Sequence, residues 1–187
     1  MDWIIGIGIA LAAIIFYFSQ KSSSSDGEDS IFVIETVRQV FDPLRGDMFP
    51  LQLASDSYLL GFLQTIVAIN GHIRNPNMST IEKGNFLHSI LQRSFGSDWK
   101  MIADRMILLS RSPDDQFLLG SDQASQVVLL GYQKLKPESM AEPQIQYALQ
   151  NARKASIEGK SSYEGAAALL MAKFLLSHKQ TCYPELP

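Results

Sequence analysis

The apolar and polar residues divide the chain into parts of different character. Trp3 to Phe18 is an apolar run with no charged side chain, whereas residues 21–30 are polar and rich in serine and acidic side chains. From Ile31 onward, apolar residues recur three or four positions apart, the spacing of one face of an α-helix. The predicted segments are a transmembrane anchor over 1–20, a flexible polar linker over 21–30, an all-helical domain over 31–180 and a C-terminal tail over 181–187.

The domain after the linker is predicted to be all-α and compact, with six or seven helices. Proline, glycine and capping residues separate the periodic segments, and the loops are short, as between antiparallel neighbours. Arg45–Pro50 and Gly71–Met78 are predicted loops. The predicted helices begin near residues 31, 57, 80, 99, 122, 143 and 162.

Local signals mark several helix ends. Asp56 is expected to be the N-cap of the almost wholly apolar segment from Ser57, which is predicted to be a helix central to the core. Ser79 and Glu82 have the spacing of a capping box. Gly96 is suited to a C-cap, and Pro143 to the first turn of a helix. These signals fix the predicted boundaries more firmly than periodicity alone.

The apolar run Trp3–Phe18 is predicted to be a single-pass membrane anchor. As a helix it spans about 24 Å, against about 30 Å for a hydrocarbon core, so its flanks would lie at the interfaces. Trp3 and Tyr17, at opposite ends, are of the types enriched at headgroup level. A cleaved signal peptide is the main alternative, but no Lys or Arg precedes the run and Tyr-Phe-Ser is a poor cleavage site.

The anchor also suggests an orientation and a contact. Lys21 follows the run and no cation precedes it, which favours a cytoplasmic helical domain. Gly6 with Ala10, and Gly8 with Ala12, form small-xxx-small steps that let two membrane helices approach closely. Homodimerisation through the anchor is one interpretation, and the ordinary frequency of Gly and Ala in membrane helices is the other.

Composition and histidines exclude several classes of site. The net charge is −3 and no run of Lys and Arg could follow a phosphate backbone, so nucleic-acid binding is not expected. No HxxxH, HExxH or CxxC spacing occurs, so neither a metal nor a cofactor is expected. His88 lies at the edge of an apolar helix face. Its imidazole is interpreted either as pH-sensitive or catalytic, or as a packed, hydrogen-bonded side chain, which we favour.

No catalytic residue is assigned. A glutamate acting as general acid needs an apolar pocket that raises its pKa. Glu138 and Glu164 lie near predicted helix starts, where the charged form is stabilised instead. Asp114–Asp115 is expected in a solvated loop. Cys182 would need a base beside it to act as a nucleophile.

We therefore expect a membrane-tethered interaction or scaffold module without catalytic activity, bound to the membrane through its N-terminal helix and to a protein partner. One alternative is a membrane-anchored hydrolase with a glutamate general acid. The other is a helical small-ligand sensor with a cavity near His88. An exposed apolar patch, expected on the helix from Ser57 or the one around Gly165, would favour the first reading.

The orientation can be tested at Lys21. Replacing it with glutamate (Lys21→Glu) removes the cation that sets the predicted topology, so the helical domain is expected on both sides of the membrane or mainly on the other side. Protease accessibility of the domain in sealed vesicles measures this. A variant with the wild-type accessibility would remove the argument for a cytoplasmic domain.

Overall fold

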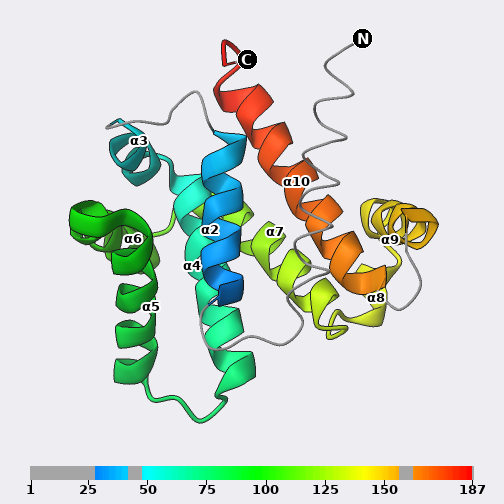
Figure 1. Cartoon of the computed structure of the whole chain (residues 1–187), viewed down its shortest axis with the longest axis horizontal. Coiled ribbons are helices and arrows are strands. Elements are labelled where there is room, and N and C mark those ends of the chain that lie inside the picture. The colour runs from blue at the N-terminus through cyan, green and yellow to red at the C-terminus, as the bar shows by residue number, and fades with distance from the viewer. Residues whose placement is uncertain (1–27, 42–47, 156–161, 187) are drawn as a thin grey trace. The chain divides into compact units, whose positions relative to one another are not determined.

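The computed structural model describes residues 28–41, 48–155 and 162–186 (Figure 1). Every regular element in these ranges is a helix, which confirms the all-α prediction. Within the same ranges, no helix is both long enough and apolar enough to cross a membrane. The predicted anchor, with Trp3, Gly6, Gly8, Ala10, Ala12, Tyr17 and the flanking Lys21, lies outside the described residues.

The helices follow one another with short connections. A 3-10 helix, η2 (Gly96–Asp98), joins two of them. The α-helices are α2 (Glu28–Val40), α3 (Phe49–Ser55), α4 (Ser57–Arg74), α5 (Thr80–Phe95), α6 (Trp99–Arg111), α7 (Asp115–Gly131), α8 (Pro137–Met140), α9 (Pro143–Ala155) and α10 (Ser162–Cys182).

The described chain divides into two compact units within α7. The N-terminal unit extends to Ser125, and the C-terminal unit runs from Gln126 to Tyr183. In the N-terminal unit, α4 is the central helix and packs against α2, α3, α5 and α6 (Figure 1). The prediction that the apolar segment from Ser57 is a core helix is confirmed, because ten of its residues are buried.

The predicted caps of α4 and α5 are confirmed. The Asp56 carboxylate accepts a hydrogen bond from the Leu59 N–H at 3.0 Å. In the capping box, the Ser79 hydroxyl accepts from the Glu82 N–H at 3.3 Å, and the Glu82 carboxylate accepts from the Ser79 N–H at 2.7 Å. Gly96 ends α5 with a φ of 57°, a value that costs glycine little.

Several predicted boundaries are wrong. Helix α3 begins at Phe49, within the predicted loop Arg45–Pro50. Helix α4 continues to Arg74, into the predicted loop Gly71–Met78, and its Gly71 packs against the Phe86 ring of α5. Helix α7 begins at Asp115 rather than near residue 122. Its actual N-terminal cap is Asp114, whose carboxylate accepts from the Phe117 N–H at 2.8 Å. Helix α10 extends to Cys182, past residue 181, where the predicted C-terminal tail begins.

Helices α4 and α7 cross at two glycines. A β-carbon added at Gly61 would lie 2.2 Å from the Phe117 carbonyl oxygen, and one at Gly120 would lie 2.1 Å from the Tyr58 carbonyl oxygen. The Ser121 hydroxyl also donates to the Gly61 carbonyl at 3.3 Å. The two backbones are therefore closer than any other residue at these positions would permit.

Polar contacts beside the crossing hold the same two helices. The Tyr58 hydroxyl donates to the Gln123 side-chain oxygen at 2.6 Å. Burial, with a smaller effect of the nearby Asp56 carboxylate, raises the pKa of Tyr58 far above its ordinary value. Because the phenol stays protonated, it remains a hydrogen-bond donor across the working pH range.

The C-terminal unit is held by small residues between α9 and α10. Ile145, Ala148, Leu149 and Ala152 are buried, and their spacing of three or four places them on one narrow face of α9. A β-carbon at Gly165 of α10 would lie 3.4 Å from the Ala152 β-carbon, an ordinary close contact. Small side chains on both helices thus allow a close α9–α10 approach.

The glycine crossing predicts a sharp contrast between glycines. Gly61→Ala or Gly120→Ala should lower the free energy of unfolding by about 3 kcal/mol, because the new methyl group meets backbone that cannot move aside cheaply. Gly84→Ala in α5 is the matched control: its added methyl meets nothing within 4 Å, and it should stabilise the helix by about 0.5–1 kcal/mol. Urea unfolding of the full chain in mild detergent, followed by circular dichroism, measures all three. Equal effects at the three glycines would contradict the close crossing.

Candidate functional site

His88 lies on α5 and is half-buried against α6. Its ring centroid is 5.2 Å from that of Trp99, with the ring planes tilted by 50°. On α6, the Lys100 ammonium lies 5.9 Å from the Trp99 ring centroid. The imidazole is thus part of the packing between two neighbouring helices. The pH-sensitive or catalytic interpretation of His88 stays a prediction.

The structure places a histidine beside Cys182, the residue that would need a neighbouring base to act as a nucleophile. Because α10 continues to Cys182, His178 lies one turn before it, and the Cys182 sulfur is 3.6 Å from His178 Nδ1. His178 is buried, Cys182 is exposed, and the Tyr183 ring meets the imidazole edge-on at 6.2 Å. His178 and Cys182 are four residues apart in the sequence, a spacing that makes two side chains neighbours on a helix. The spacing is informative only if the helix is known to extend to Cys182.

The carboxylates considered for acid catalysis are exposed or bound at helix ends. Glu138 and Glu164 are both exposed. In the described part of the chain no glutamate is among the buried polar residues, which are Thr36, Asp56, Asn70, Ser94 and His178. Asp114 has a lowered pKa because the Phe117 N–H, and then the Ser57 hydroxyl, donate to its carboxylate. That shift favours the charged form, the reverse of what a general acid needs.

Metal ligands do not gather anywhere in the three described ranges, where no group of three or more His, Cys, Asp or Glu side chains could hold an ion.

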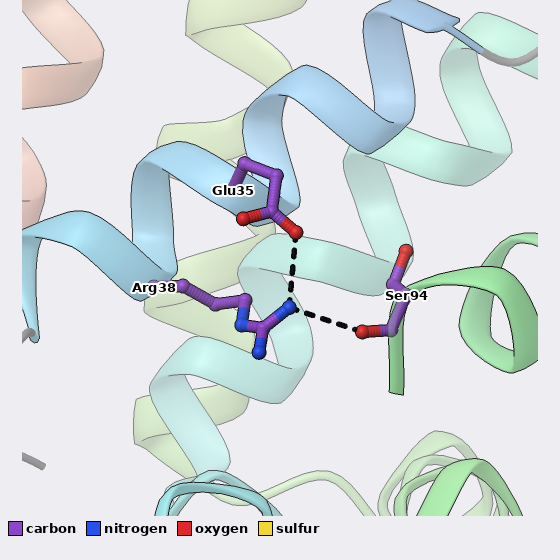
Figure 2. Close-up of polar contacts among 3 residues, drawn as sticks. All are labelled: Glu35, Arg38 and Ser94. Atoms are coloured by element: carbon purple, nitrogen blue, oxygen red, sulfur yellow. Dashed lines mark hydrogen bonds and ion pairs between the residues drawn. The ribbon is translucent and has the colours of Figure 1, made fainter. Parts of the chain in front are cut away.

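An arginine that sequence reasoning missed ties three helices together. Arg38 Nη1 on α2 donates to Glu35 Oε1 at 3.0 Å and to the Ser94 carbonyl oxygen of α5 at 3.2 Å (Figure 2). The guanidinium carbon lies 6.0 Å from the Phe49 ring centroid and 5.9 Å from that of Phe95. Since Ser94 lies in the last turn of α5, its carbonyl has no intrahelical donor, and Arg38 satisfies it. The arrangement is that of a helix-end contact rather than a reactive site.

The exposed apolar side chains gather in the N-terminal unit. Ile107 and Leu108 on α6 are 41% and 57% exposed, and Leu118 and Leu119 on α7 are 52% and 44% exposed. We call these four residues the α6–α7 patch. The other exposed large apolar side chains in the described ranges are Met48, Leu51, Ile81 and Tyr147.

Helix geometry brings the four patch residues close to one connection. Helix α6 ends at Arg111 and α7 begins at Asp115. Each pair therefore lies within about one turn, roughly 5 Å along its helix, of the residues that join the two helices. The patch is on neither helix expected from the sequence. Ten residues of the helix from Ser57 and nine of the helix around Gly165 are buried, because a stretch that is apolar on every face packs into the core.

Comparison with known proteins finds no matching family model, no matching curated protein and no matching solved structure. The function is therefore argued from the chain's own surfaces.

The lowered pKa of Asp114 predicts a pH dependence. A carboxyl whose pKa is depressed in the folded state stabilises the fold above its unfolded pKa, about 3.9, and this stabilisation is lost as pH falls through the folded value. Asp114→Asn should therefore lower the free energy of unfolding at pH 7, by less than about 1 kcal/mol because the group is exposed, and by less again at pH 3.

Urea unfolding of the full chain at the two pH values measures this change. Asp115→Asn, the same chemical change one residue along the chain, is the matched control. A loss from Asp114→Asn that is as large at pH 3 as at pH 7 would contradict a charge-dependent cap.

Proposed function

We propose that this chain is a membrane-tethered helical module that assembles proteins at a membrane surface without catalysing a reaction. Its anchor is the apolar run of residues 3–18, and its helical domain faces the cytoplasm. Its binding surface is the α6–α7 patch, and the occupant of that surface is a protein helix with an apolar stripe.

The observation that carries the proposal is the exposure of four large apolar side chains in two pairs, each pair within about one turn of the connection between α6 and α7. Isolated exposed leucines are common on protein surfaces, but a group within one turn of a single connection is not a scattered distribution. The charged residues Arg105, Arg111 and Asp115, on the same two helices within one turn of the pairs, are all exposed. An apolar centre with a polar rim is the usual composition of a protein-binding surface.

The geometry of the patch favours a helix as its partner. Ile107 and Leu108 project from one exposed face of α6, and Leu118 and Leu119 from the first turns of α7. A partner helix lying across the α6–α7 patch can bury its apolar residues, spaced three or four apart, against both pairs. The core contacts of Phe117 and Gly120 fix α7 in the orientation that turns Leu118 and Leu119 outward.

Tethering makes even a weak contact effective. The serine-rich part of the linker before α2, residues 21–27, has an expected root-mean-square length of about 15 Å if it behaves as a flexible coil. A domain held that close to the membrane has a high effective concentration toward other proteins at the same surface. A modest binding surface is then sufficient for assembly.

Site-specific photo-cross-linking tests the proposal. A benzophenone amino acid placed at Leu118 in the full chain, in its own membrane, should form light-dependent protein adducts. The same residue placed at Ile81 is the matched control, because Ile81 is 76% exposed but lies outside the patch. Adding Leu108→Glu to the Leu118 probe should abolish its adducts, since a carboxylate replaces half of the apolar contact on α6.

Adducts at Leu118 that disappear with Leu108→Glu, together with none at Ile81, would support the binding surface. Equal labelling at both positions, or no adduct at Leu118, would contradict it.

A further inference from the structure

The exposed face of α6 carries an acidic and a basic side chain at equal distances on either side of two apolar side chains. Asp104, Ile107, Leu108 and Arg111 are all exposed, and they are spaced at i, i+3, i+4 and i+7. That spacing places them on one face of the helix. The stripe, which we call the α6 stripe, has an acid at one end, two apolar side chains in the middle and a base at the other end.

Such a stripe is complementary to itself. When two identical helices pack antiparallel about a two-fold axis between Ile107 and Leu108, each residue faces the one equally distant from the axis in the other copy. Ile107 then faces Leu108, and Asp104 faces Arg111. The acid of each copy meets the base of the other, and the apolar pairs meet in the centre.

We propose that the partner of the α6 stripe is a second copy of this chain, packed antiparallel across this axis. The proposal rests on the proposed function, of which it names the partner. It differs from dimerisation through the anchor because the contact lies in the helical domain.

The charges at the ends of the stripe are available for such a contact. Asp104 and Arg111 lie about 10 Å apart along the helix axis, too far to pair with each other. In the described part of the chain neither is in an ion pair, whereas Arg38 is paired with Glu35 and Arg105 lies close enough to Asp114 to lower its pKa. An intermolecular contact would give Asp104 and Arg111 partners without breaking an existing one.

The size of the stripe predicts a dimer that depends on the tether. A stable interface generally buries more than about 1,000 Å² in total, and a contact centred on four residues from each copy lies at the low end of that range. The free chain should therefore dimerise weakly. Confinement to one membrane surface through the anchor raises the local concentration and populates the dimer.

Charge reversal tests the pairing directly in the full chain. Asp104→Arg places two arginines opposite each other, and Arg111→Asp places two aspartates opposite each other, so each variant should self-associate on the order of tenfold less. Mixed together, the two variants form two attractive pairs and should associate like the wild type. The double variant D104R/R111D should self-associate like the wild type for the same reason.

The assay uses full chains labelled with donor and acceptor fluorophores and incorporated into the same vesicles, with energy transfer read against surface density. Lys83→Asp is the matched control, because Lys83 is exposed on α5 outside the stripe and should leave energy transfer unchanged. Since the mixture and the double variant carry the same substitutions as the single variants, their recovery separates a lost contact from a lost fold. Circular dichroism of each variant confirms that helicity is kept.

Loss of energy transfer in both single variants, with its recovery in the mixture, would support the dimer. Unchanged energy transfer in the single variants, or no recovery in the mixture, would overturn it. If the charge-reversal experiment shows no dimer but Leu118 still forms cross-links to another protein, the proposed function stands and its partner is that other protein. Failure of both would reject the binding surface itself.

Discussion

The close crossing of α4 and α7 is the constraint on which the N-terminal unit depends. Gly61 and Gly120 leave no room for a β-carbon against the opposite backbone, so the two helices can approach this closely only with glycine at both positions. Tyr58, Ser121 and the Asp114 cap add hydrogen bonds around the same contact. Because Phe117 and Gly120 face inward, the helical period turns Leu118 and Leu119 outward. The exposure of Leu118 and Leu119 is thus a consequence of the core contact.

The sequence predicted the features that depend on local chemistry. Asp56, the capping box at Ser79 and Glu82, and Gly96 were identified correctly because each acts on backbone groups within a few residues. The segment from Ser57 was recognised as a core helix because it has no polar face. These predictions require no knowledge of which elements meet.

Features that depend on distant contacts were missed. Asp114 was missed for a different reason: its cap bond to the Phe117 N–H is local, but the helix was predicted to begin near residue 122, so Asp114 was interpreted as a solvated loop residue. Arg38 gave no sequence signal, because its bond to the Ser94 carbonyl joins residues far apart in the chain. The exposed apolar surface was expected on the most apolar helices, but those helices form the core. The exposed apolar residues lie instead on amphipathic α6 and on the first turns of α7. The predicted anchor and the cytoplasmic orientation stay predictions.

The proposed dimer requires that the exposed face of α6 becomes covered when copies of the chain meet at a membrane surface. Hydrogen–deuterium exchange of the full chain in vesicles, at low and at high surface density, tests this without altering the sequence. Peptides from α6 and the first turns of α7 should exchange more slowly at high density, with α9 unchanged. Exchange in α6 that is the same at both densities would contradict the proposed dimer.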